Sequence, residues 1–200
     1  LSYDRERQTL TTVLRLGDGQ GPNSIAEVCI RPTTGRDAPP GVVVTTTMPK
    51  TVQTRTALTR DVTWMLQLRR DLRDFYELTR DEPHLAHVEA EAKGRILRSP
   101  TLFEDVVKTI LTTNTSWQGT LRMTNALVTH LGTPLPAKPE RRAFPTPAQI
   151  AAVDEAFLRD TTRLGYRAPR ILTLARDVVA HRIDLEALKD ADRPTGEVRE

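Results

Sequence analysis

The sequence predicts a mainly α-helical protein with a small antiparallel β region at its N terminus. Short runs rich in β-branched residues, separated by turn-forming residues, fill the first 58 positions. From about Thr59 onward the apolar residues follow the 3.6-residue period of helices instead of the two-residue period of strands. We therefore expect a β-rich region over residues 1–58 and a helical domain over residues 59–200.

Three runs are expected to form the small sheet, over residues 10–16, 24–31 and 41–47. The third run, GVVVTTT, is dominated by β-branched side chains, which pack well on a pleated surface. Turn formers stand between the runs: GDG at 17–19, PTTG at 32–35 and PPG at 39–41. Strands joined by such turns are typical of an antiparallel sheet.

The first helix is expected between Thr59 and about Thr79. Thr59 can cap its N terminus, and Asp61 is favourable in the first turn beside the helix dipole. A second helix should begin at Ser99, with Pro100 at the first helical position. Its apolar residues form a wide stripe, so we expect it to be buried against other helices. They are Leu102, Phe103, Val106, Val107, Ile110 and Leu111.

A third helix is expected over residues 116–131, with Gly132 ending it. A proline-rich link over residues 134–145 follows, and then TPAQ at residues 146–149 has the pattern of a capping box that opens a short helix. The capping box marks where the helical pattern resumes.

Two further helices are expected, over residues 154–162 and 169–181, separated by the helix-breaking Gly165. Residues 194–197 have the pattern of a helix start that the chain does not complete by residue 200. We therefore expect the helical domain to be incomplete at its C terminus and the chain to be a fragment.

The composition excludes a few classes of protein. No apolar run approaches the roughly 18 residues that a membrane span needs, and no signal-peptide pattern opens the chain. The single cysteine, Cys29, excludes an internal disulfide framework and an all-cysteine metal site, and favours a reducing cytoplasm. His84 and His87 have no third ligand nearby, so we expect no metal site and no cofactor. The net charge of +3 permits nucleic-acid binding without establishing it.

Two stretches carry more information than generic helices do. The first is SPTLFEDVVKTILTTNTSW, over residues 99–117. The second is AFPTPAQI over residues 143–150, followed by LGYRAPR over residues 164–170. In this order and with these gaps they resemble the helix-hairpin-helix (HhH-GPD) DNA glycosylases, the superfamily of 8-oxoguanine and 3-methyladenine DNA glycosylases. The resemblance covers residues 59–200 and implies a helical DNA-glycosylase architecture.

The resemblance implies a bacterial base-excision DNA repair enzyme. Such an enzyme flips a damaged base out of double-stranded DNA and hydrolyses its N-glycosidic bond. We expect it to act as a monomer in the cytoplasm, at the nucleoid, without a membrane partner. The family's glycine-rich hairpin and catalytic aspartate are expected beyond residue 200. No catalytic residue is therefore assigned, and the 200-residue chain alone is expected to be inactive.

The same motif match places possible DNA contacts on this chain. Asn114 would fill the gap left by the flipped base and bond its partner base, although an asparagine there can also simply cap the next helix. Tyr166 would wedge between base steps, and Arg167 would pair with the unpaired base or a phosphate; a packed tyrosine beside a solvated arginine is the other interpretation. Arg163 and Arg170 would extend a phosphate-binding patch, or be scattered surface charges.

Trp117 would line the base pocket by stacking on the flipped base, although its spacing also fits a core residue. Two other functions stay open: a non-catalytic DNA-binding helical module, and a helical protein-interaction domain. The residues leave open which base is removed and whether the enzyme also cleaves the sugar.

Overall fold

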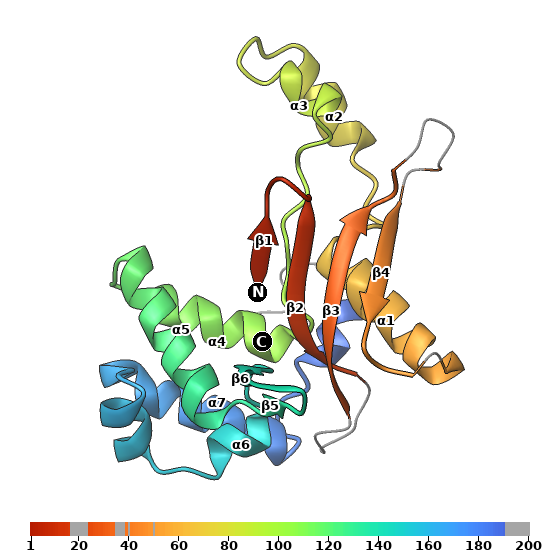
Figure 1. Ribbon diagram of the computed structural model, residues 1–200. Helices are drawn as coiled ribbons and strands as arrows, with labels where there is room; N and C mark the ends of the chain where they lie inside the picture. Colours follow the sequence, from red (N-terminus) through yellow and green to blue (C-terminus); the bar gives the residue numbers. More distant parts are fainter. Residues whose placement is uncertain (17–23, 35–38, 40, 50, 191–200) are drawn as a thin grey trace. The chain divides into compact units, whose positions relative to one another are not determined.

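The computed structural model describes residues 1–16, 24–34, 39, 41–49 and 51–190. The fold is mainly helical with a small four-stranded antiparallel sheet, as predicted (Figure 1). The chain forms two compact units, one made of Leu1–Lys50 with Thr101–Glu200 and the other of Thr51–Pro100. The division between a β-rich region 1–58 and a helical domain 59–200 stays a prediction.

The sheet has the strand order β1-β2-β3-β4, and every neighbouring pair is antiparallel. The strands are β1 (Ser2–Asp4), β2 (Thr9–Arg15), β3 (Ile25–Pro32) and β4 (Val42–Thr46). The three predicted runs correspond to β2, β3 and β4, whereas β1 is too short to show a period. Leu14 of β2 lies opposite Ala26 of β3, and Val28 of β3 lies opposite Thr46 of β4. Because paired residues and every second residue of a strand point to the same side, these side chains share one face of the sheet. Leu14, Val28 and Ile30 on that face are buried.

A two-stranded hairpin occupies the proline-rich link, where no strand was predicted. It consists of β5 (Pro134–Leu135) and β6 (Lys138–Arg142). Leu135 packs with Ile25 of β3 in a small apolar cluster. Glu27 of β3 accepts hydrogen bonds from Lys138, at 2.9 Å, and from Arg141. The hairpin is therefore anchored to the sheet by interactions between distant parts of the chain, which the local composition does not reveal.

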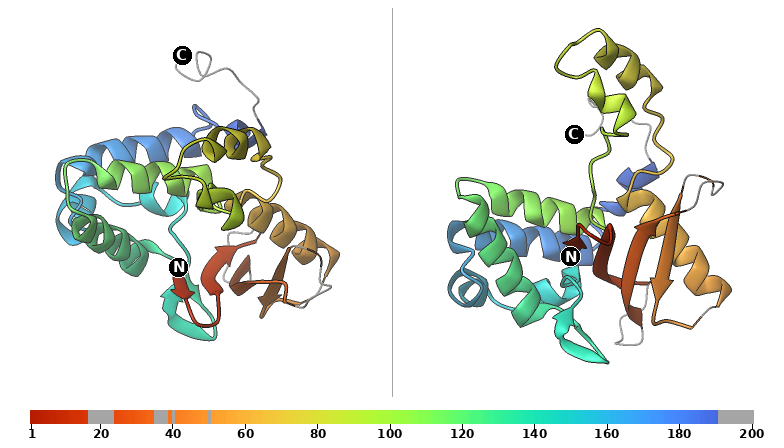
Figure 2. Two further views of the ribbon diagram at one scale, coloured as in Figure 1. Left: turned by 90° about the horizontal axis from the view of Figure 1, so that it is seen from above. Right: turned by 45° about the horizontal axis from the view of Figure 1, so that its top comes forward.

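The main core of the unit made of Leu1–Lys50 and Thr101–Glu200 is built from three helices. They are α4 (Leu102–Thr112), α5 (Trp117–Leu131) and α7 (Ala168–Val179). In Figure 2 the green α4 runs alongside the blue α7. Phe103, Val107 and Leu111 of the predicted stripe are buried in this core, as expected. Helix α6 (Pro147–Ala151) completes it, and the capping box predicted for Thr146 and Gln149 is present.

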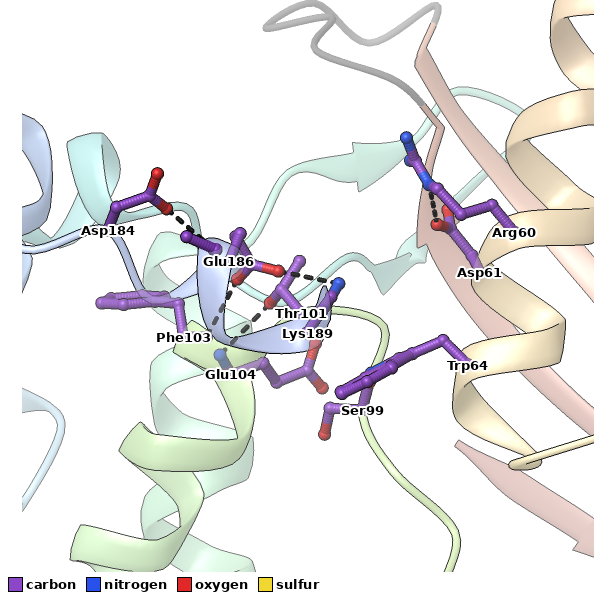
Figure 3. Close-up of polar contacts among 11 residues, drawn as sticks. Arg60, Asp61, Trp64, Ser99, Thr101, Phe103, Glu104, Asp184, Glu186 and Lys189 are labelled. Atoms are coloured by element: carbon purple, nitrogen blue, oxygen red, sulfur yellow. Dashed lines mark hydrogen bonds and ion pairs between the residues drawn. The ribbon is translucent and has the colours of Figure 1, made fainter. Parts of the chain in front are cut away.

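The N terminus of α4 differs from the prediction. Thr101, rather than Ser99, is the N-cap: its extended backbone lets its Oγ1 accept from the Glu104 amide at 3.2 Å. Glu186, in the 3₁₀ segment η4 (Glu186–Asp190), accepts from the Phe103 amide at 3.2 Å (Figure 3). These carboxylate and hydroxyl oxygens satisfy amides that the first helical turn leaves free.

Glu104 itself lies beside Lys108, with Oε1 and Nζ 2.5 Å apart. Burial raises the pKa of the Glu104 carboxyl, and the neighbouring Lys108 charge opposes that shift.

In the unit Thr51–Pro100 the predicted single helix from Thr59 to Thr79 is wrong. The structure has α1 (Val52–Met65), α2 (Arg73–Arg80) and the short α3 (His87–Ala90). Thr51 caps α1, because its Oγ1 accepts from the Thr54 amide at 3.1 Å. Gln67 has φ +51, a left-handed conformation that stops the helical path after Met65. The apolar period continues across this break and therefore hid it.

Among the described residues, no helix combines the length and apolar character needed to cross a bilayer. His84 and His87 are both exposed, and no group of three or more His, Cys, Asp or Glu side chains in the described ranges is placed to hold a metal ion. Cys29 is partly exposed on the sheet, with its Sγ 3.7 Å from Thr11 Oγ1.

Candidate nucleic-acid interface

The first part of the site is the turn between α4 and α5, over residues 113–116. Asn114 has φ +44 and is exposed. Asparagine is one of the few residues that tolerate this left-handed conformation. Ser116 caps α5, since its Oγ accepts from the Gly119 amide at 3.2 Å. The interpretation of Asn114 as the cap of the next helix is therefore wrong, and its side chain is left at the surface of the turn.

The second part is the loop before α7. The helix predicted over residues 154–162 contains the π-helical turn η2 (Phe157–Thr161), a form that is frequent at functional sites. The backbone then reverses through two left-handed residues, Arg163 at φ +58 and Gly165 at φ +57. The 3₁₀ turn η3 (Gly165–Arg167) follows and leads directly into α7.

These two parts meet at the carbonyl oxygen of Thr113. The Tyr166 hydroxyl donates to this oxygen at 3.3 Å and lies 3.5 Å from the Thr113 hydroxyl. Nη2 of Arg167 donates to the same oxygen and, at 3.3 Å, to the carbonyl oxygen of Asn114. The Asn114 turn and the Tyr166-Arg167 loop therefore lie side by side in the structure.

Arg167 differs in position from the other arginines of the predicted patch. Arg163 and Arg170 are exposed, whereas Arg167 is only 6% exposed. Its guanidinium carbon lies 4.5 Å from the centre of the Tyr166 ring, and its Nη1 lies 3.8 Å from Sδ of Met123. Its Nε has no hydrogen-bond partner in the described part of the chain. The guanidinium thus holds the two parts of the site together; its contact with DNA stays a prediction.

The two aromatic residues of the site are open to solvent. Tyr166 is 53% exposed and Trp117 is 68% exposed. Trp117, at the start of α5, is therefore not a core residue, and the packing alternative for it is wrong. Its role in a base pocket stays a prediction. The ring of Tyr166 is fixed on one side by the Arg167 guanidinium and is free to contact a ligand elsewhere.

The residue that sequence reasoning missed is Thr113. It acts through its main-chain oxygen, which accepts hydrogen bonds from both Tyr166 and Arg167. A backbone carbonyl has no signature in the sequence, so no signal was available to find it. The exposed cations Arg163 and Arg170 flank the loop that carries Tyr166. Such an arrangement suits a polyanion better than a neutral ligand.

Comparison with known proteins supports the predicted resemblance. Residues 107–197 match the family model of the HhH-GPD superfamily base excision DNA repair proteins. No curated protein matches the sequence. The match covers both parts of the site, from the C-terminal half of α4 through α7. The predicted resemblance to the HhH-GPD DNA glycosylases is therefore confirmed.

Solved structures of DNA glycosylases share the fold. MBOgg1 in complex with a low affinity DNA ligand has a TM-score of 0.68 at 22% identity, covering 99% of this chain and 61% of that one. The 3-methyladenine DNA glycosylase of Archaeoglobus fulgidus has a TM-score of 0.67 at 20% identity, covering 92% and 59%. The 8-oxoguanine glycosylase/lyase of Clostridium acetobutylicum, in its apo form, has a TM-score of 0.63 at 17% identity, covering 95% and 59%.

The chain therefore spans about three fifths of the length of the solved chains it matches, with 61% for the first of them. At these identities the similarity concerns the fold. The chain shares the helical fold of these solved DNA glycosylases.

Proposed function

We propose that this chain is the DNA-distorting part of a base-excision DNA glycosylase, which flips a damaged base out of the duplex and hydrolyses its N-glycosidic bond. The observation that carries the proposal is the joint at the Thr113 carbonyl, which holds the exposed Tyr166 beside the exposed Asn114 turn. The family match and the fold support the reaction class. One of the similar glycosylases was solved with double-stranded DNA containing cytosine opposite 8-oxoguanine.

Asn114 and Tyr166 each stabilise a different part of the duplex once the base has been flipped out. Removing a base from the stack costs a few kcal/mol, because its stacking and pairing are disrupted. The Asn114 amide, which carries both donors and an acceptor, compensates part of this cost by bonding the base left unpaired. The Tyr166 ring compensates another part by wedging between neighbouring base steps. Both side chains come from one chain, so a monomer is sufficient for this step.

The three arginines have different parts in the proposal. The exposed Arg163 and Arg170 neutralise phosphates beside the wedge. The buried Arg167 is a positioning residue that keeps the Asn114 turn and the Tyr166 ring in register. Cleavage of the N-glycosidic bond requires a carboxylate that stabilises positive charge developing on the sugar, and no residue of this chain is assigned that role.

The experiment is a comparison of binding to two duplexes, one undamaged and one with a tetrahydrofuran abasic analogue, measured by fluorescence anisotropy. The chain should prefer the analogue, because the gap is already open there. Tyr166→Ala should reduce this preference about tenfold, since an aromatic stack on a base contributes about 1–3 kcal/mol. Asn114→Gly should also reduce it, without strain, because glycine accepts φ +44.

Matched controls separate function from packing. Tyr3→Ala removes another exposed tyrosine, 58% exposed on β1, and should leave the preference unchanged. Asn125→Ala removes an exposed amide within α5 and should do the same. If Tyr166→Ala weakened binding to both duplexes equally, the proposed wedge would be excluded. The same holds if the loss of binding free energy were matched by an equal loss in the free energy of unfolding. Excision of damaged bases is then assayed on the protein that contains this chain.

A further inference from the structure

A second cationic surface lies in the unit Thr51–Pro100. The turn after α1, over residues 66–70, runs beside the irregular segment over residues 93–98. Three hydrogen bonds join the last residue of α1 and this turn to the irregular segment. They are Arg98 amide to Met65 carbonyl at 2.9 Å, Gln67 Nε2 to Ile96 carbonyl at 2.7 Å, and Arg95 Nη2 to Arg70 carbonyl at 3.1 Å. The arginines that these segments carry are therefore held at fixed positions on the unit.

We call the four arginines of these two segments the arginine patch; they are Arg69, Arg70, Arg95 and Arg98. The first three are exposed and Arg98 is partly exposed. Arg98 is stacked, with its guanidinium carbon 4.2 Å from the centre of the Trp64 ring. None of the four pairs with a carboxylate among the residues that the structure describes. Stacking and the single bond to a carbonyl leave most of their N–H donors free.

Three other arginines of this unit pair with carboxylates, and the first of them is Arg60, with its Nε 2.9 Å from Oδ1 of Asp61. Arg73 makes a two-point contact with Asp71, with Nη2 and Oδ2 2.6 Å apart. The hydrogen bond from Arg73 lowers the pKa of Asp71 to about 2. Arg80 makes a two-point contact with Glu89, at 2.7 and 2.8 Å. The arginine patch therefore differs from these pairs in keeping its positive charge available to a ligand.

We propose that the arginine patch is a second contact with the phosphate backbone of duplex DNA, separate from the Asn114 turn. This inference rests on the proposed function, because it takes duplex DNA as the partner. Guanidinium groups match phosphate oxygens in a fork-like geometry and bind them without reading the base sequence. The contact therefore adds affinity for any duplex and leaves the preference for a lesion to Asn114 and Tyr166.

The test is the salt dependence of binding to undamaged and abasic-analogue duplexes. For each phosphate that the protein neutralises, the logarithm of the affinity falls by about 0.9 per unit of the logarithm of salt concentration. The double variant R69Q/R70Q and the single variant Arg95→Gln should reduce this slope by about one for each phosphate that is no longer bound. Both duplexes should be weakened to the same degree, so the ratio of their affinities stays constant.

Matched controls come from the same unit. Arg73→Gln and Arg80→Gln remove arginines that are already neutralised by Asp71 and Glu89. Their slopes should equal that of the unaltered chain. Arg98→Lys keeps the charge and removes the guanidinium stacking, so it should retain the slope while changing the fluorescence of Trp64. Circular dichroism melts verify that each variant is folded.

The outcomes separate the two proposals. If the chain prefers the lesion duplex but R69Q/R70Q does not change the salt dependence of its affinity, the arginine patch alone is overturned. A protein partner then becomes the better assignment for this surface. A slope that depends on the patch, without lesion preference, overturns the proposed glycosylase site and supports the patch. An equal decrease of the slope in Arg73→Gln shows a bulk charge effect and overturns the patch. Absence of DNA binding overturns both.

Discussion

Arg167 is a buried cation whose hydrogen bonds run to main-chain oxygens. It is 6% exposed, and it bonds the carbonyl oxygens of Thr113 and Asn114. A buried polar group is costly unless it is bonded, so this guanidinium favours the one arrangement in which both carbonyls face it. The left-handed backbone of Asn114, at φ +44, is kept in place by that arrangement.

Replacement of Arg167 by lysine should therefore destabilise the chain. A lysine keeps the charge but has no planar fork to bridge the Thr113 and Asn114 carbonyls while stacking on Tyr166. We expect the free energy of unfolding to fall by about 1–3 kcal/mol, measured by urea denaturation. Arg170→Lys, at an exposed position nearby, should stay within about 0.5 kcal/mol. Equal effects of the two variants would contradict the positioning role.

At the scale of elements, the β5-β6 hairpin has only a weak strand pattern in its sequence and is stabilised by charged side chains. Glu27 of β3 is 12% exposed at its side chain and lies between Lys138 and Arg141 of β6. The hydrogen bond from Lys138, together with the charge of Arg141, holds the pKa of the Glu27 carboxyl below its ordinary value. The ionised carboxylate is thus the form that stabilises the hairpin.

Glu27→Gln should lower the free energy of unfolding by about 1 kcal/mol at neutral pH. Because the folded pKa of Glu27 is depressed, its contribution is present above the ordinary pKa and is lost as the pH falls through the folded value. The difference between the unaltered chain and the variant should therefore shrink in acid, in denaturation curves recorded at several pH values. Glu140→Gln, at an exposed position on β6, is the control. A difference that did not vary with pH would exclude the ion pair as its cause.

At the scale of the whole molecule, one compact unit is built from two stretches that are far apart in sequence. Leu1–Lys50 contributes the sheet and Thr101–Glu200 contributes the helices and the hairpin. The apolar cluster of Ile25, Leu135 and Ala143 joins them, together with the hydrogen bond from Arg15 to Thr133 at 2.7 Å. Such a joint couples the stability of the sheet to that of the helical core.

Leu135→Ala should test this coupling. Leu135 is 4% exposed, and truncation of a buried leucine costs about 2–5 kcal/mol. Hydrogen exchange should accelerate together at slowly exchanging amides of β3 and of α7, since both belong to one cooperative unit. Leu121→Ala, at a position 37% exposed on α5, should have a much smaller effect. Acceleration confined to the sheet would show that the two stretches unfold independently.

The local pattern of the sequence determined most elements and their inner faces. Runs rich in β-branched residues between turn formers predicted β2, β3 and β4, and the stripe through Phe103, Val107 and Leu111 predicted the buried face of α4. The helix-breaking Gly165 placed Tyr166 in a loop, and the motif match placed Asn114 between two helices. These properties depend on a few consecutive residues, so a sequence can record them.

Only the tertiary structure decided which surfaces meet. The burial of Arg167, the role of the Thr113 carbonyl, the break at Gln67 and the hairpin β5-β6 all depend on residues distant in the chain. An arginine or a main-chain oxygen looks the same in sequence whether it faces solvent or a partner. Its environment is set by long-range packing, where the cost of an unbonded buried group selects one arrangement among several that the local pattern allows.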